Sequence, residues 1–123
     1  MELKLQYDST INYFQSYSSH AISIKDIEYQ SSLIVTPRKI IADWGPTNID
    51  FVSGDDIEKI VNLNPEVILI GTGKRLRFPK PEFYAEIAGK NVGIEFMDTL
   101  AACRTYNVLA TESREVATGL ILE

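Results

Sequence analysis

Residues 66–70 read Glu-Val-Ile-Leu-Ile, in which Glu66 precedes four consecutive apolar side chains that are mostly β-branched. Such a run is typical of a strand that is buried on both faces, as the central strands of a parallel sheet are. Two further strands are predicted downstream, at 91–97 and 116–122, and a helix is expected before each of them. The order strand–helix–strand–helix–strand implies right-handed crossovers, so it predicts an α/β domain with a largely parallel core.

Both connecting segments carry helix signals. Pro81 suits a first helical position and Gly89 suits a helix end, which predicts a helix over 81–89. Asp98 is a candidate N-cap for a longer helix over 98–111. The face of this helix that points inward is expected to hold Ala102, Cys103, Tyr106, Leu109 and Ala110. A shorter helix is expected after Ser53, a candidate N-cap followed by acidic residues.

The first 45 residues show strand patterns instead of helix patterns. Residues 1–19 are polar with scattered aromatics, and they predict an extended N-terminal arm with room for one short strand. Strands are expected at 21–29, 31–36 and 39–44, and their short links favour antiparallel hairpins. The prediction is therefore one three-layer α/β domain over 1–123, with a mixed, largely parallel central sheet and an antiparallel N-terminal strand region.

Composition excludes several classes of protein. A chain of 123 residues with 45% hydrophobic and 24% charged residues is an ordinary single-domain globular chain. Its net charge of -5 argues against a nucleic-acid partner, because binding to nucleic acid requires many phosphates to be neutralised. Cys103 is the only cysteine and His20 the only histidine, so we expect no metal site and no cofactor. No secretory signal, transit pattern or membrane-spanning apolar run is evident, so we expect a cytoplasmic protein.

The most uneven charge feature is the segment 71–80, which reads GTGKRLRFPK and holds four of the 12 basic residues. Ligands bind beyond the carboxyl ends of parallel strands, and both this segment and residues 98–99 are expected at that edge. Its glycines, backbone N–H groups and positive charge suit an anion or the acidic surface of a partner, or else the segment is a solvated turn. The predicted recognition surface comprises Gly71, Thr72, Gly73, Lys74, Arg75, Arg77, Asp98, Thr99, Arg104 and Asn107.

Known phosphate motifs do not account for this segment. A Walker loop needs glycine where Ile68 stands and a hydroxyl residue where Arg75 stands, and a dinucleotide fingerprint needs glycine at Leu76.

Two polar residues of the predicted helix 98–111 keep two interpretations open. Arg104 either pairs with Asp98 or binds a ligand, and Asn107, unfavourable inside a helix, needs local bonding or a function. Cys103 is expected in the core and not as a nucleophile, so no catalytic residue is assigned.

Several runs carry a resemblance to a known family: 71–79 (GTGKRLRFP), 92–99 (VGIEFMDT), 101–109 (AACRTYNVL) and 112–116 (ESREV). Together they resemble the MTH-type domain-of-unknown-function family, which includes the mitochondrial complex I assembly factor three and small bacterial and archaeal proteins. The similarity covers nearly all of residues 20–123. It implies a single-domain, three-layer α/β fold around a mixed sheet, and it brings no established activity. Because no transit peptide is evident, the mitochondrial role is not carried over.

Two functions from different classes fit these observations. The first is a non-enzymatic interaction or assembly protein with a protein partner, related to respiratory complex I assembly as the resemblance suggests. The second is a domain that binds an anion or small molecule, or a weak enzyme, using Gly71–Gly73 and the start of the helix 98–111. We favour the first, because the sequence lacks a nucleophile–base pair and concentrates its basic residues in one loop. The sequence does not predict an oligomeric state.

Overall fold

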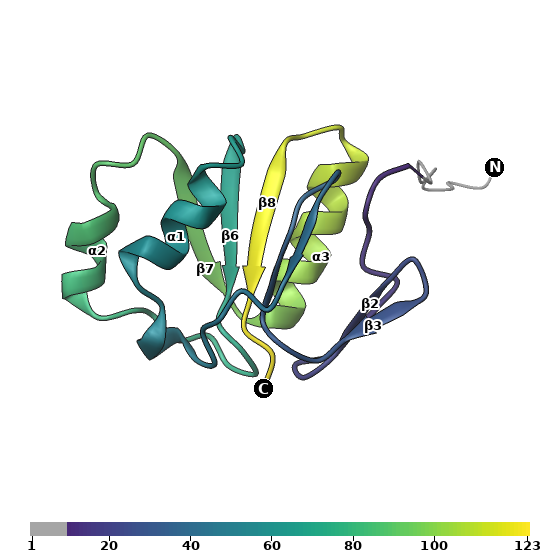
Figure 1. Cartoon of the computed structure of the whole chain (residues 1–123), viewed down its shortest axis with the longest axis horizontal. Coiled ribbons are helices and arrows are strands. Elements are labelled where there is room, and N and C mark those ends of the chain that lie inside the picture. The colour runs from purple at the N-terminus through teal and green to yellow at the C-terminus, as the bar shows by residue number, and fades with distance from the viewer. Residues whose placement is uncertain (1–9) are drawn as a thin grey trace.

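A computed structural model describes residues 10–123, whose middle layer is a mixed five-stranded sheet (Figure 1). The strand order is β5-β4-β8-β6-β7. These strands are β4 (Leu33–Val35), β5 (Ile40–Ala42), β6 (Val67–Gly71), β7 (Gly93–Met97) and β8 (Val116–Leu120). Strand β6 is parallel to β7 and β8, whereas β4 is antiparallel to β5 and β8. The predicted α/β class and mixed central sheet are therefore confirmed.

Helices cover both faces of this sheet (Figure 1). Helices α1 (Gly54–Val61) and α2 (Pro81–Ile87) lie on one face, preceded by the 3-10 turn η1 (Ile49–Phe51), and α3 (Thr99–Thr111) lies on the other. The predicted caps are present: Ser53 forms a capping box with Asp56, and the Asp98 carboxylate accepts a hydrogen bond from the N–H of Ala101. Successive residues of β6 point to opposite faces, so Leu69 packs with α3 while Ile68 and Ile70 pack with α1 and α2.

The N-terminal region forms a second, antiparallel sheet of β1 (Ser16–Tyr17), β2 (Ile22–Ile24) and β3 (Ile27–Tyr29). The prediction of one strand over 21–29 is wrong. Lys25 and Asp26 have φ angles of 49° and 66°, and two consecutive left-handed residues turn the chain back as a tight hairpin. Strand β1 is the one short strand expected within the arm 1–19. Residues 1–9 of that arm lie outside the described residues.

Other boundaries differ by one or two residues. The strand expected at 66–70 is β6 at 67–71, and the strand expected at 91–97 begins at 93. The helix expected over 81–89 ends at Ile87. The strand expected over 116–122 ends at Leu120: the N–H of Ile121 still donates to the carbonyl of Gly71, the last residue of β6, but the carbonyl of Ile121 accepts from the Thr99 hydroxyl and not from a strand.

Candidate functional site

The loop after β6 and the first turn of α3 lie side by side at the carboxyl edge of the parallel strands. The carbonyl of Gly73 accepts a hydrogen bond from the N–H of Thr99 at 2.9 Å. The Thr99 hydroxyl accepts one from the N–H of Gly73 at 2.9 Å and donates to the carbonyl of Ile121 at 2.6 Å. Thr99 is fully buried, so one side chain joins three segments of the chain. The structure thus brings together Gly71–Gly73 and residues 98–99, which the sequence placed at one edge.

The space directly beyond β6 and β8 is filled by the chain itself. A Cβ atom on Gly71 would lie 2.8 Å from the Leu120 side chain and 3.1 Å from the Cα of Thr99. Gly71 is therefore needed for close packing between these segments, not for the approach of a ligand. What this edge offers to other molecules is the outer part of the loop.

That outer part is folded around a buried hydroxyl. Thr72 is fully buried, donates to the carbonyl of Arg75 at 2.7 Å and accepts from the N–H of Arg77 at 3.1 Å. Residues 74–78 consequently project from the molecule, and all five are exposed. The Thr72 hydroxyl thus fixes the backbone of the loop, while the side chains of residues 74–78 are exposed.

The four basic residues of the loop differ in their surroundings. Arg77 forms an ion pair with Asp50 of η1 at 2.7 Å, which fastens the loop to that turn. Neither Lys74 nor Arg75 has an ion pair with any other residue between 10 and 123. Lys80 is the residue that precedes α2 and is exposed. Lys80 likewise has no ion pair with any residue in 10–123, so the unpaired positive charge of the loop lies at Lys74, Arg75 and Lys80, the first two adjacent in its outer part.

Exposed apolar side chains flank the Arg77–Asp50 pair. Phe51 follows Asp50 and is 66% exposed, while Leu76 and Phe78 on either side of Arg77 are 48% and 65% exposed. A hollow of about 150 Å³ adjoins this region, lined among others by Asp50, Pro79 and Phe83. We call Phe51, Lys74, Arg75, Leu76 and Phe78 the loop patch. Burying such apolar side chains against another protein is favourable, and aromatic residues and arginine are enriched in protein interfaces.

The predicted residues on α3 have other positions. Asp98 caps the helix and has no ion pair with Arg104, which is exposed. The Asn107 amide is bonded to the backbone of Phe14: its oxygen accepts from the N–H at 2.9 Å and its nitrogen donates to the carbonyl at 3.0 Å. Asn107 thus holds the N-terminal segment, 93 residues away in sequence, and the binding roles predicted for Arg104 and Asp98 stay predictions.

Cys103 lies fully inside the core, where burial raises the pKa of its thiol to about 12. Since the thiolate is the reactive form, the side chain is chemically inert at neutral pH, in agreement with its predicted place in the core. Among residues 10–123 no group of three or more His, Cys, Asp or Glu side chains is arranged to hold a metal ion.

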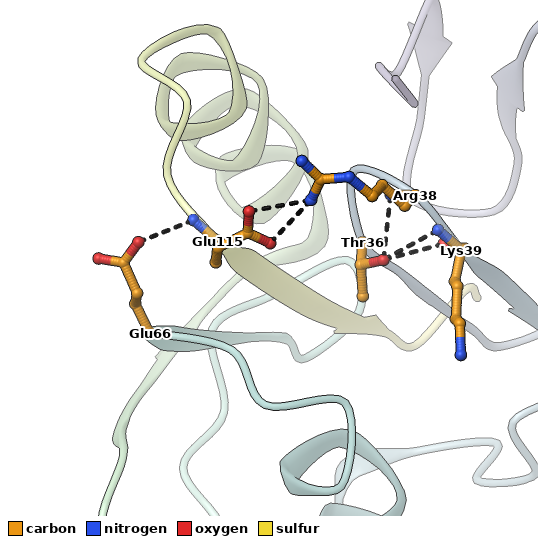
Figure 2. Close-up of polar contacts among 5 residues, drawn as sticks. All are labelled: Thr36, Arg38, Lys39, Glu66 and Glu115. Carbon is orange, nitrogen blue, oxygen red and sulfur yellow. Dashed lines mark hydrogen bonds and ion pairs between the residues drawn. The ribbon is translucent and has the colours of Figure 1, made fainter. Parts of the chain in front are cut away.

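A polar site that the sequence analysis does not predict lies at the opposite end of the sheet, where the parallel strands begin (Figure 2). The Arg38 guanidinium donates to both oxygens of the Glu115 carboxylate, at 2.9 and 3.2 Å, and both side chains are exposed. Hollows of about 260 and 250 Å³ both border this pair, one reaching Lys39 and Asn62 and the other Tyr13. The pair joins residues 77 positions apart, and no local motif marks either of them.

Glu66 extends this polar site. Its carboxylate accepts from the N–H of Glu115 at 3.0 Å and pairs with Arg114 at 3.2 Å. The hydrogen bond from the Glu115 backbone, and secondarily Arg114, hold the pKa of Glu66 below its ordinary value against a smaller opposing effect of burial.

Comparison with known proteins finds relatives across most of the chain. The model of the family "Protein of unknown function (DUF498/DUF598)" matches residues 14–121. The "13 kDa major membrane protein" of Francisella tularensis is 30% identical over 110 residues, which are 89% of this chain and 89% of that protein. The NADH dehydrogenase (ubiquinone) 1 alpha subcomplex assembly factor 3 of Xenopus tropicalis is 28% identical over 121 residues, and the chain spans 66% of its length.

A solved structure agrees with the fold. The crystal structure of a protein from Bordetella parapertussis superposes with a TM-score of 0.84 at 30% identity, covering 93% of this chain and 98% of that one. In the part of the chain that the structure describes, no helix has the length and apolar character needed to cross a bilayer.

Proposed function

This chain belongs to the DUF498/DUF598 family of proteins of unknown function, and we propose that it acts by binding another protein through the loop patch, without catalysing a reaction. The proposed partner presents carboxylates next to apolar side chains. Its carboxylates would pair with Lys74 and Arg75, and its apolar groups would cover Phe51, Leu76 and Phe78.

The relatives support an interaction role in general terms. One of them is named as an assembly factor of NADH dehydrogenase, and the assembly of a complex requires contacts between proteins. This chain is a distant relative of that protein, so we propose the kind of activity and not the same partner.

The observation that carries the proposal is the loop patch itself. Large apolar side chains normally avoid water, and here Phe51 and Phe78 are about two-thirds exposed beside two cations without ion pairs. In a chain with a net charge of -5, this local positive charge selects acidic partners. The ordered loop beneath the patch supports the proposal further, because a partner would not have to order it on binding.

Quantitative capture from a lysate of the organism that encodes the chain tests the proposal. The variants are Lys74→Ala/Arg75→Ala and Phe78→Ser, which leave the Arg77–Asp50 pair in place. We expect both to lose, by tenfold or more, the same protein that the unchanged chain retains. Exposed substitutions cost within about 0.5 kcal/mol, so the fold should be kept.

A matched control removes the same charge elsewhere. Lys39→Ala/Lys59→Ala deletes two exposed lysines away from the loop, and it should capture the protein as the unchanged chain does. If this control lost the captured protein to the same extent, the loss in the loop variants would be explained by the change in net charge alone. Unchanged capture by both loop variants would reject the loop patch as a docking surface.

Cytoplasmic location remains part of the proposal. A relative is named as a membrane protein, so fractionation of cells into cytoplasmic and membrane pools, followed by detection of the chain, is the direct measurement. We expect it in the cytoplasmic pool, and recovery with the membranes after a high-salt wash would contradict this expectation.

A further inference from the structure

We propose that the turn at Gly73 and Lys74 is a carboxylate-binding site, that the side chain of Glu123 occupies it in the free chain, and that a carboxylate of the partner replaces Glu123 on binding. This inference rests on the proposed function and adds the chemical group that the loop patch recognises.

The site consists of a backbone donor and the space beside a glycine. The N–H of Lys74 donates to the carboxylate Oε1 of Glu123 at 3.2 Å. Gly73 has a φ of +109°, and a Cβ atom there would lie 2.2 Å from that same oxygen. The φ angle requires glycine, and the absent Cβ leaves the space that the flexible Glu123 carboxylate occupies beside the Lys74 N–H.

The position of Glu123 is fixed by its backbone, and its carboxylate has no ion pair among the described residues. Ile121 is buried and is bonded at both its N–H and its carbonyl, and the N–H of Glu123 donates to the carbonyl of Ser19 at 2.7 Å. The Glu123 side chain is exposed and forms no ion pair with any residue in 10–123. Its carboxylate can therefore leave the turn while the end of β8 stays in place.

The neighbouring charges favour an incoming anion. Lys74 and Arg75 are exposed at the turn without ion pairs to other described residues, and the Glu123 carboxylate at the Lys74 N–H does not pair with either, so both cations stay available to further carboxylates of the partner. Glu123 is tethered next to the site, so it competes at a high effective concentration. The free chain then binds single carboxylates weakly, and a partner must supply several to displace Glu123.

The probe is a peptide of four glutamates, acetylated at its N-terminus and amidated at its C-terminus. It is titrated into the isotope-labelled chain, and its binding is monitored by NMR at the amide resonance of Lys74. The variant Glu123→Ala should shift this resonance, because its hydrogen bond is lost. The probe should return the resonance toward its original position and should bind Glu123→Ala about tenfold tighter than the unchanged chain, as expected when one charge-assisted hydrogen bond no longer competes. The corresponding peptide of four glutamines should produce no shift.

Glu112→Ala is the matched control, since it removes one exposed carboxylate from the end of α3 and changes the net charge equally. It should bind the probe as the unchanged chain does. Equal affinity of Glu123→Ala and the unchanged chain, or an equal gain in Glu112→Ala, would overturn the proposal. The probe is not a protein, so tighter binding here with unchanged lysate capture would keep the carboxylate site and reject the docking surface. The reverse pair of results would keep the docking surface and reject the site.

Discussion

The two ends of the central sheet are built from different interactions. At the carboxyl end, the buried hydroxyls of Thr72 and Thr99 bind loop backbone to strand and helix. At the amino end, the exposed ion pair Arg38–Glu115 joins a hairpin to β8 (Figure 2). A broken buried hydrogen bond leaves groups unpaired away from water, whereas an exposed ion pair exchanges its partner for water at little cost. The carboxyl end should therefore be the rigid one, suited to hold a docking loop.

The substitution Thr99→Val tests this contrast most strongly. Valine keeps the shape of the side chain but leaves the N–H of Gly73 and the carbonyl of Ile121 without their partner, so the free energy of unfolding should fall by about 2–4 kcal/mol. Urea unfolding of both proteins measures it. Thr105→Val, in the same helix and without such hydrogen bonds among residues 10–123, should change stability far less. Equal effects would show that the Thr99 hydroxyl is not a tie between the segments.

The substitution Gly73→Ala comes next in expected size. Alanine at a φ of +109° is strained, and its Cβ would displace Glu123, so we expect a loss of about 1–3 kcal/mol. Gly89→Ala is the control, because a Cβ there would have no atom of residues 10–123 within 4 Å apart from those of its chain neighbours. Repeating Gly73→Ala in the Glu123→Ala background separates the backbone strain from the contact with Glu123. A loss no greater than that of Gly89→Ala would contradict the left-handed turn.

At the amino end, Glu115→Ala should lower the free energy of unfolding by no more than about 1 kcal/mol, because the ion pair is exposed. The difference should shrink further in concentrated salt, which screens the pair. Denaturant unfolding at low and high salt is the measurement. A loss as large as that of Thr99→Val would remove the contrast between the two ends.

The smallest effect is expected from Glu66 and depends on pH. Its pKa is lower in the folded chain than its ordinary value of 4.5, so the charged form stabilises the fold. This contribution is present above about pH 4.5 and is lost as the pH falls through the folded-state pKa. The stability difference between the unchanged chain and Glu66→Gln should therefore be largest near neutral pH and vanish in acid. A difference that grows in acid would mean that the pKa is raised instead.

Local patterns in the sequence were sufficient for the parallel half of the fold. The apolar run at 66–70, Pro81 and the cap Asp98 each report a nearby backbone conformation, and all three elements are present. The sequence does not predict the hairpin at Lys25 and Asp26, because this pair lacks the Asn-Gly or Asp-Gly signature of two-residue turns. The division of the N-terminal strands between two sheets depends on long-range packing and has no local signal.

For the candidate site, the sequence could place the loop and the start of α3 at one edge but not the partners of their side chains. Asp50 and Arg77 are 27 residues apart, and the pairing of Asn107 with Phe14 spans 93. A polar amide inside a helix did indicate that Asn107 has a partner, although not which one. Residues 121–123 cover the carboxyl end of the parallel strands because β8 stops at Leu120. The sequence does not show this end, since its apolar residues continue to Leu122.

The position of β8 has a consequence for the folding of this protein during its synthesis on the ribosome. Strand β8 lies between the antiparallel pair β4–β5 and the parallel pair β6–β7, although it is the last strand to be synthesised. Until residues 116–120 leave the exit tunnel, the two halves of the sheet have no strand to join them, and each exposes an apolar edge. Folding must therefore wait for nearly the whole domain, and many of its contacts close large loops, which slows the reaction. Nascent chains halted before residue 116 should be the form of this protein most prone to aggregate and most in need of a chaperone.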